Sequence, residues 1–264
     1  AGREQQQHEA SHDPAAVHPV VFSTTAFPDY NTERLKAHIA RTGGTWLAST
    51  KLTADSFQKQ ARDQKIDILV ELASHSEGNH LSAVARRAAP VQTTYLGWPS
   101  TTGLSSIDWR IVDTNTDPPG YESHCSERLA RLDPCFICYN KPTGTPEPAL
   151  PEGPPVFGSF NALHKLSPTC LRLWGQVMRA TPGSTLILKF AQSEHEHVRR
   201  RILDALSAQG VEPTRIQFLS RTPDLNSHLA LYNRMHIALD TVPYNGTTTT
   251  CEALWMGVPV ITLE

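Results

Sequence analysis

The sequence predicts an α/β protein with two lobes, each built on a doubly wound parallel sheet. Short apolar runs, which are typical of buried parallel strands, alternate with amphipathic helical patterns along the chain. The alternation is interrupted at 141–155, where six prolines and two glycines are typical of a linker. The length of 264 residues accommodates two lobes or one large domain, and the linker favours two.

This linker sets the expected domain boundaries. Residues 1–18 are polar and rich in His and Gln, so we expect a disordered lead-in. An incomplete N-terminal lobe is expected at 19–140, and a truncated C-terminal lobe at 156–264.

Helix and strand patterns alternate through the first lobe. The helical pattern of 30–41 has Leu35 and Ile39 on one face and ends at Gly43 and Gly44. The run 66–70 is the clearest candidate for a buried strand. The expected strands are 20–23, 45–47, 66–70, 91–96, 107–112 and 129–132, and the expected helices are 30–41, 56–64 and 81–88.

The second lobe repeats the pattern. Ser167 and Pro168 predict a helix start, with Ser as the cap and Pro at the first helical position. Gly210 closes a later helix. The expected strands are 156–160, 185–190, 216–219, 237–239 and 260–263, and the expected helices are 168–180, 195–209, 228–233 and a further one after the threonines 247–250.

Composition and charge exclude several classes. A net charge of −2 gives no electrostatic reason to expect nucleic acid. Neither a secretory signal nor an apolar run of the roughly 18–20 residues that a membrane span needs is present, so we expect no membrane contact and a cytoplasmic location. Cys135 and Cys138 have zinc or redox spacing, but no second pair completes a site. We therefore expect no metal, and free thiols in a reducing compartment.

The stretch after 237–239 carries the strongest functional signal. A strand ends at Asp240, Asn245 and Gly246 form a turn, and four threonines precede a helical pattern. A helix N-terminus leaves about four N–H groups without partners and carries roughly half a positive charge, so it binds anions such as phosphate. The alternative is that one threonine caps the helix and the others are solvated. Glu252, one turn further, could accept from a ribose, and together these features favour a nucleotide diphosphate.

Three more side chains are candidates. Lys165 lies just beyond a strand end and suits a pyrophosphate; the alternative is a solvated surface lysine. His228 is expected at the start of a helix that leads into the strand 237–239, facing the same crevice. His75 lies in the loop 71–79 after a strand, although an isolated loop histidine is more often exposed or satisfied. Neither a GxGxxG nor a Walker A sequence occurs, which argues against an NAD-binding Rossmann domain.

Several motifs, in the same order, resemble the O-linked N-acetylglucosamine (O-GlcNAc) transferase family, including its bacterial and SPINDLY-like members. The resemblance covers roughly 64–264. Its motifs are Ala-Pro-Val-Gln at 89–92, Leu-Gly-Trp-Pro-x-Thr-Thr-Gly at 96–103, Phe-Asn-x-x-x-Lys-x-x-Pro at 160–168, Leu-Asp-Thr-x-Pro-Tyr-Asn-Gly with four threonines at 239–250, and Glu-Ala-Leu-Trp-Met-Gly-Val-Pro at 252–259.

The resemblance implies a GT-B fold, with two Rossmann-like lobes and the nucleotide sugar in a cleft between them. It also implies an inverting, metal-independent transfer of N-acetylglucosamine from UDP-GlcNAc to Ser or Thr of a protein, with no cofactor. The chain resembles a catalytic region truncated at both ends, and the TPR repeats that recruit acceptor proteins in the family are absent from it.

The family's functional residues carry over to matching positions. Two would be catalytic: Lys165, which contacts the diphosphate and stabilises the departing UDP, and His75, on the sugar and acceptor side. The residues implied to bind the nucleotide sugar are Asn161, Lys165, His228, Asn245, Gly246, Thr247, Thr248, Thr249 and Glu252. Those implied to line the sugar and acceptor cleft are Pro99, Thr101, Thr102 and Gly103.

Three alternatives remain open at this point. The donor could carry another sugar, as GDP-fucose or UDP-glucose does. A GT-B-shaped UDP-sugar epimerase would need a pair of acid/base carboxylates, and we find no such pair. The chain could also be a nucleotide-sugar-binding fragment without turnover.

Overall fold

The computed structural model describes residues 13–76, 78–140, 142 and 144–263. The chain divides into two compact units, Ala1–Asn140 and Lys141–Glu264. Residues 1–12, which belong to the predicted lead-in, lie outside the described residues, as do 77 in the His75 loop and 141 and 143 in the predicted linker.

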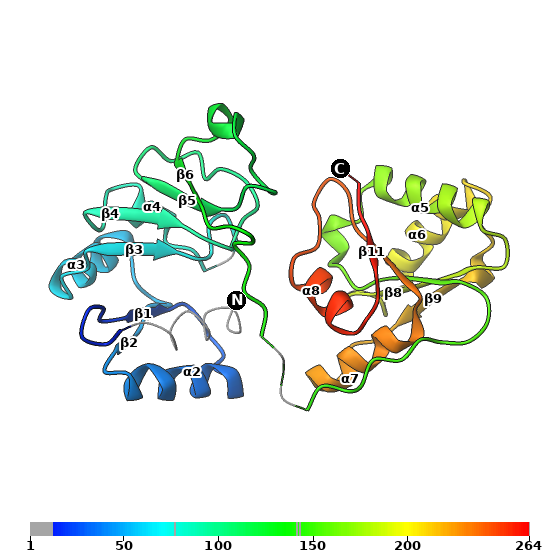
Figure 1. Cartoon of the computed structure of the whole chain (residues 1–264), viewed down its shortest axis with the longest axis horizontal. Helices are drawn as coiled ribbons and strands as arrows, with labels where there is room; N and C mark the ends of the chain where they lie inside the picture. The colour runs from blue at the N-terminus through cyan, green and yellow to red at the C-terminus, as the bar shows by residue number, and fades with distance from the viewer. Residues whose placement is uncertain (1–12, 77, 141, 143, 264) are drawn as a thin grey trace. The chain divides into compact units, whose positions relative to one another are not determined.

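The first unit contains two parallel sheets in its described residues (Figure 1). Strand β1 (Val20–Ser23) pairs with β2 (Thr45–Ala48), and the other sheet has the order β3 (Ile68–Glu71), β4 (Val91–Thr94), β5 (Trp109–Val112) and β6 (Arg128–Arg131). The helices are α2 (Tyr30–Arg41), α3 (Ala54–Asp63), α4 (Leu81–Val84) and the 3₁₀ helix η1 (Tyr121–His124). Phe57 of α3 and Val84 of α4 pack on Leu69 of β3, so these helices cover one face of the four-stranded sheet.

Several predicted boundaries in this unit are wrong, for local backbone reasons. The helix predicted at 81–88 stops at Val84, and Arg87 has a φ of 58°. The strand predicted at 91–96 stops at Thr94, and Leu96 has a φ of 63°. Both residues adopt the left-handed region, which neither a helix nor a strand can continue through.

The interpretation of 66–70 as a buried strand also needs correction. Ile68 and Val70 are 62% and 43% exposed, whereas Leu69 between them is buried. Successive side chains of a strand point to opposite faces, and only the Leu69 face is covered by the helices. An apolar run shows that a strand is present but not which of its faces is covered.

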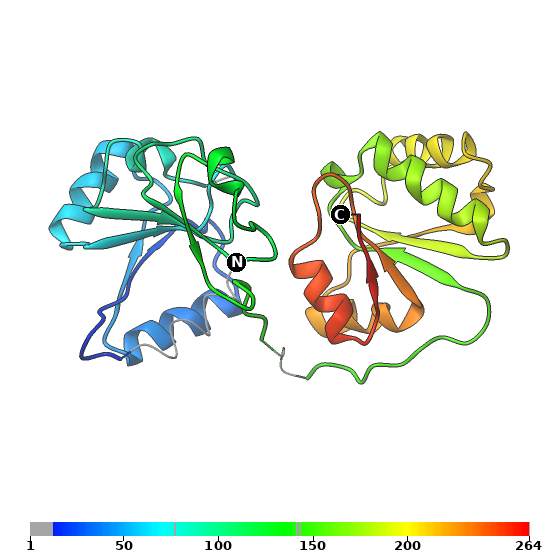
Figure 2. The ribbon, with the colours of Figure 1, turned by 45° about the horizontal axis from the view of Figure 1, so that its top comes forward.

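The second unit is a five-stranded parallel sheet with helices on both faces (Figure 2). The strand order is β11 (Val260–Ile261), β10 (Ile237–Leu239), β7 (Val156–Ser159), β8 (Thr185–Lys189) and β9 (Ile216–Leu219). The helices are α5 (Pro168–Ala180), α6 (Glu196–Ser207), α7 (Leu225–Ala230) and α8 (Thr248–Trp255), with 3₁₀ helices η2 (Leu163–Lys165), η3 (Pro213–Arg215) and η4 (Leu231–Arg234).

Alternating strand residues supply the two cores of this unit. Leu186 and Leu188 of β8 point to the face that α5 and α6 cover. Ile187, between them, packs with Leu229 of α7 and Ala253 of α8 on the other face. This is the doubly wound arrangement that the alternating sequence pattern predicts.

The predicted partition of the strands is confirmed. The strands predicted at 66–70 and 91–96 pair within the four-stranded sheet, whereas those predicted at 156–160 and 237–239 pair within the five-stranded one. The predicted helix at 228–233 is displaced, because the Asp224 side chain accepts from the backbone N–H of Ser227 and starts α7 earlier.

The proline-rich segment belongs to the second unit and is bound to η4. The Asn233 side chain donates to the carbonyl of Glu147 and accepts from the N–H of Ala149. Residues 147–149 are therefore held against η4. No helix in the described part of the chain has the length and apolar character that crossing a membrane requires.

The core of the second unit supports a stability prediction. Leu206 of α6 is completely buried, so Leu206→Ala should leave a cavity and lower the free energy of unfolding by about 2–5 kcal/mol. Leu150→Ala is the matched control, because Leu150 is 68% exposed and its change should stay within about 0.5 kcal/mol. Denaturant unfolding of both variants measures the difference, and equal losses would contradict the assigned core.

Candidate functional site

The main candidate site lies at the carboxyl edge of the five-stranded sheet. Strand β7 is followed by Asn161, β8 ends at Lys189, and β10 is followed by Asp240. Asn161 and Asp240 are buried polar residues. Open α/β proteins hold their ligands outside the carboxyl ends of the strands, so this edge is where a ligand is expected.

The Asp240 carboxylate organises the loop that follows β10. Its Oδ1 accepts from the N–H groups of Thr241 at 2.8 Å and Gly246 at 2.7 Å. Its Oδ2 accepts from Asn245 Nδ2 at 2.8 Å and from Thr262 Oγ1 at 2.9 Å. Four donors therefore satisfy one buried carboxylate and close the loop 241–246 on itself.

Lys165 lies beside this loop. Its Nζ donates to the carbonyl of Asn245 at 2.8 Å and is 4.0 Å from the centroid of the Tyr244 ring. Burial lowers the pKa of the Lys165 ammonium, and the nearby charge of Asp240 opposes that shift. The side chain is held in place and is not a freely solvated surface lysine.

The N-terminus of α8 adjoins the same loop. Thr247 occupies the cap position, but its side chain makes no cap hydrogen bond, so the alternative of an ordinary threonine cap is not what the structure contains. The Thr249 hydroxyl donates to Asn161 Oδ1 at 2.9 Å, and the Thr250 hydroxyl donates to the Gly246 carbonyl at 3.1 Å. The backbone N–H groups of the first turn are left to bind an anion.

Gly246 is required where the loop enters the helix. A Cβ at this position would lie 2.6 Å from Thr249 Oγ1 and 3.0 Å from Asn161 Oδ1. Only glycine lets the backbone approach these side chains so closely.

Glu252 and His228 form a second part of the site. His228 Nε2 lies 3.0 Å from Glu252 Oε2, and the Tyr232 hydroxyl donates to the same oxygen at 3.2 Å. Lys189 Nζ lies 2.7 Å from the other ring nitrogen, Nδ1. The Glu252 oxygen Oε2 is therefore bound within the protein.

The residues predicted in the first unit gather around the loop after β4. His75 Nε2 lies 3.0 Å from the carbonyl of Thr102, and the His75 ring meets the Trp98 ring edge-on at 5.8 Å. Pro99 and Gly103 are exposed, whereas Thr102 is buried. Gly97 lets this loop lie close to the loop after β3, because a Cβ on it would lie 2.2 Å from the Leu72 carbonyl oxygen.

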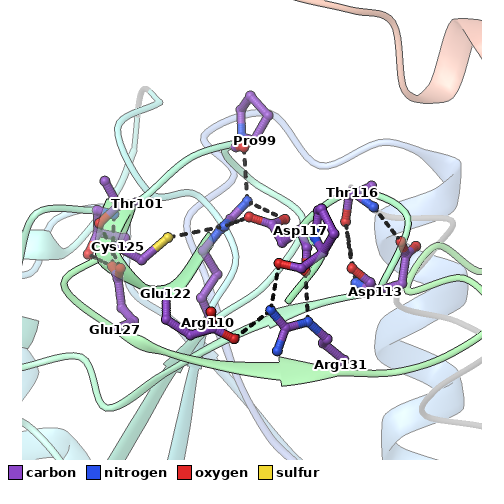
Figure 3. Close-up of polar contacts among 12 residues, drawn as sticks. Pro99, Thr101, Arg110, Asp113, Thr116, Asp117, Glu122, Cys125, Glu127 and Arg131 are labelled. Carbon is purple, nitrogen blue, oxygen red and sulfur yellow. Dashed lines mark hydrogen bonds and ion pairs between the residues drawn. The ribbon is translucent and has the colours of Figure 1, made fainter. Parts of the chain in front are cut away.

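Two buried charged residues hold this loop from below (Figure 3). The Glu127 carboxylate accepts from the Thr101 hydroxyl at 2.7 Å, from the Thr102 N–H at 2.8 Å and from the Thr102 hydroxyl. Arg110 pairs with Asp117 at 2.6 Å and donates to the Pro99 carbonyl at 2.9 Å. The hydroxyls of Thr101 and Thr102 thus donate to Glu127.

The structure thus joins the predicted residues into two sets. Contacts or chain proximity link one set at the edge of the second unit: Asn161, Lys165, His228, Asn245, Gly246, Thr247, Thr248, Thr249 and Glu252. The other set, in the first unit, is His75, Pro99, Thr101, Thr102 and Gly103.

Sequence reasoning missed several residues that shape these sets, Arg110 among them. Lys189 could have been found, because it is the next-to-last residue of the strand predicted at 185–190, which ends at the ligand-binding edge. Glu127 and Tyr232 carried no such signal, since they reach their partners only through the fold. Within the described residues, no cluster of three or more His, Cys, Asp or Glu side chains could hold a metal ion.

Comparison with known proteins first defines the class. The structure aligns, with a TM-score of 0.92, with a mutant of the O-GlcNAc transferase of Thermobaculum terrenum, which is 37% identical in sequence. The alignment covers 99% of this chain and 49% of that one. The GT-B class implied by the sequence motifs is confirmed for the two parallel-sheet units.

The family follows from the sequence. The model of glycosyl transferase family 41 matches residues 7–142 and 143–264, so the chain belongs to this family. It is 40% identical over 258 residues to a protein of Solanum lycopersicum named "Probable UDP-N-acetylglucosamine--peptide N-acetylglucosaminyltransferase SPINDLY", and 40% identical over 256 residues to the Arabidopsis thaliana protein of the same name. These matches cover 96% of this chain and 28% of the length of each relative.

The loop after β10 gives a testable prediction. Asp240→Asn places an amide N–H₂ where the carboxylate accepted hydrogen bonds. The free energy of unfolding should therefore fall by about 1–3 kcal/mol. Amide hydrogen exchange at Gly246 should also accelerate. Asp204→Asn, at an exposed position on α6, is the control. Unchanged exchange at Gly246 would show that Asp240 does not hold the loop.

Glu127 gives a pH-dependent prediction. Burial alone would raise its pKa, but hydrogen bonds from Thr102 and Thr101 outweigh burial and leave the pKa lowered. A lowered folded-state pKa stabilises the protein above the unfolded-state value, and this stabilisation is lost as pH falls through the folded-state value. The stability gap between the native protein and Glu127→Gln should therefore be larger at pH ~7 than at pH ~4.

Denaturant unfolding at both pH values measures this gap. The exposed Glu212→Gln variant serves as the control for removing a surface carboxylate and should show only a small gap. If the Glu127→Gln gap is the same at both pH values, the ionised carboxylate is not what holds the loop.

Proposed function

We propose that this chain is the nucleotide-sugar-handling part of a protein O-GlcNAc transferase, which moves N-acetylglucosamine from UDP-GlcNAc to Ser or Thr hydroxyls of proteins. Membership of glycosyl transferase family 41 supports the proposal. One structural observation carries it: Lys165 and the N-terminus of α8 adjoin the same loop, 241–246, at a sheet edge.

This arrangement suits the leaving group of such a transfer. The bond between the anomeric carbon and the β-phosphate oxygen breaks, and its electron pair stays on UDP. A new bond forms from the anomeric carbon to the acceptor oxygen, which loses its proton. Negative charge therefore grows on the diphosphate, where a fixed ammonium and preorganised N–H groups stabilise it. Lys165 would supply the ammonium, and the first turn of α8 would supply the N–H groups.

His75 is the residue proposed for the acceptor side. The Thr102 carbonyl only accepts hydrogen bonds, so a neutral His75 ring bound to it carries its proton on Nε2. Its Nδ1 is then the basic nitrogen, which suits a group that takes the proton of an attacking hydroxyl. The loop of Pro99, Thr101, Thr102 and Gly103 would line this side through its backbone and carbon atoms, because Glu127 holds the threonine hydroxyls.

The proposal also covers the metal requirement of the transfer, the recruitment of acceptor proteins and the location of the reaction. The transfer needs no metal, because Lys165 and the helix N-terminus supply the positive potential. Acceptor proteins are recruited by TPR repeats elsewhere in a longer protein. The reaction takes place in the cytoplasm.

Binding of UDP to the 264-residue chain tests the core of the proposal. UDP should bind in buffer that contains a chelator, as measured by titration calorimetry. Lys165→Ala should weaken the affinity about tenfold to a hundredfold, which corresponds to the ~1.5–3 kcal/mol of a hydrogen bond to a charged group.

Lys59→Ala is the matched control, because Lys59 is solvent-exposed and pairs with Asp63 on its own helix. It should leave UDP affinity unchanged. Binding that appears only with added magnesium or manganese would refute the metal-free part of the proposal. Equal UDP affinity in Lys165→Ala and the native chain would refute the role of Lys165.

A further inference from the structure

A chain of hydrogen bonds runs through three side chains from β8 to α8 by way of α7 (these elements are labelled in Figure 1). Lys189 Nζ lies 2.7 Å from His228 Nδ1, and His228 Nε2 lies 3.0 Å from Glu252 Oε2. Lys189 also donates to Thr222 Oγ1 at 3.3 Å, and Tyr232 donates to Glu252. Each ring nitrogen of His228 therefore has a partner inside the protein.

The chemistry of the two ends fixes the proton on the ring. A lysine ammonium only donates hydrogen bonds, so His228 Nδ1 must accept with its lone pair. An ionised carboxylate only accepts, so Nε2 must carry the proton and donate it to Glu252. The partner of one ring nitrogen sets the tautomer of the other. His228 is thus held as the neutral ring protonated on Nε2.

The surroundings fix the plane of the ring as well. The ring centroid of His228 lies 5.5 Å from that of Phe160 and 5.6 Å from that of Tyr232. Its side chain is 18% exposed, whereas that of Glu252 is 7% exposed. Because both nitrogens are engaged, the ring can offer a ligand only its carbon edge and its face. A planar heterocycle such as a nucleobase stacks on a surface of this kind.

Among these three hydrogen-bonded side chains, Lys189 is the one whose placement indicates a role beyond packing. Its ammonium is partly withdrawn from water, and this burial lowers its pKa, while Glu252 opposes the shift. A lysine stem can reach solvent, yet this ammonium turns inward onto a histidine nitrogen and a threonine hydroxyl.

We infer that Lys189 is a positioning residue for nucleotide binding: it keeps Nδ1 of His228 unprotonated and holds the neutral ring in one orientation, so that the ring presents its face to the base of the nucleotide. The inference rests on the proposed function, because it takes the ligand at this edge to be a nucleoside diphosphate. Lys189 acts through His228 and does not itself touch the reacting atoms.

Ring spectra of the native chain test the tautomer. Two-bond proton–nitrogen correlation spectra of ¹⁵N-histidine-labelled chain distinguish the two neutral tautomers and the charged ring. The His228 signals are assigned by their loss in His228→Asn. We expect one neutral form, protonated on Nε2. A ring protonated on Nδ1, or a mixture of tautomers, overturns the inference without any variant of Lys189.

Variants of Lys189 test the positioning role. In Lys189→Met, a side chain without donors replaces the ammonium and leaves Nδ1 free to take a proton, while Glu252 still accepts from Nε2. The charged ring should therefore appear beside the neutral form, and UDP affinity should fall about tenfold. Lys189→Arg keeps a group that only donates, so it should restore the single neutral form and most of the affinity. Lys59→Met, on the surface of α3, should change neither property.

The outcomes separate the two proposals. If the native chain binds UDP and Lys189→Met keeps both the single neutral form of His228 and the affinity, Lys189 is only a structural lysine. A Lys189→Met variant that does not fold leaves the test to Lys189→Arg, in which loss of the single neutral form overturns the inference. If the native chain shows the expected tautomer but binds no UDP, the proposed function fails at this site, while the tautomer assignment stands.

Discussion

The second unit's site depends on the Asp240 carboxylate. An ionised carboxylate in a buried place is stable only where donors surround it, and Asp240 has four. Those donors come from the loop itself and from Thr262 beyond β11, so satisfying the charge and folding the loop are the same event. The negative charge also opposes the loss of a proton from the partly buried Lys165. The buried Asp240 carboxylate therefore helps to keep Lys165 positively charged, which an anionic ligand at this edge would need.

The first unit uses the same physical device at its own sheet edge. Glu127, again a buried carboxylate, gathers the hydroxyls and an N–H of the loop after β4, and Arg110 fixes the neighbouring carbonyl of Pro99 (Figure 3). Loops that carry function need a rigid support, because their own backbone has few regular hydrogen bonds. Hydrogen bonds to a buried charge fix the orientation of each loop group that makes them, whereas apolar packing does not.

Much of the fold follows from the sequence, and the errors have identifiable causes. The strand 216–219 and the helix 168–180 were predicted with their observed bounds, because apolar periodicity and the Ser-Pro start leave little choice. Boundaries failed at Arg87 and Leu96, where non-glycine residues adopt positive φ without any local sign in the sequence. Site residues were predictable where they follow a strand. Glu127 was not, because its loop partners lie 25 or 26 residues away and meet it only in the folded chain.

The threonines show that residue type alone does not say which hydroxyls the fold engages. The hydroxyls of Thr101 and Thr102 donate to Glu127, and those of Thr249 and Thr250 donate to Asn161 and to the Gly246 carbonyl. Thr247, by contrast, makes no cap hydrogen bond. In the proposed site an anion would also meet the backbone N–H groups of the first turn of α8 and the ammonium of Lys165. Such groups need no rotation of a hydroxyl when charge develops, so they would stabilise it without reorganisation. Thr249 and Thr250 would thus contribute by fixing the backbone on which the site depends.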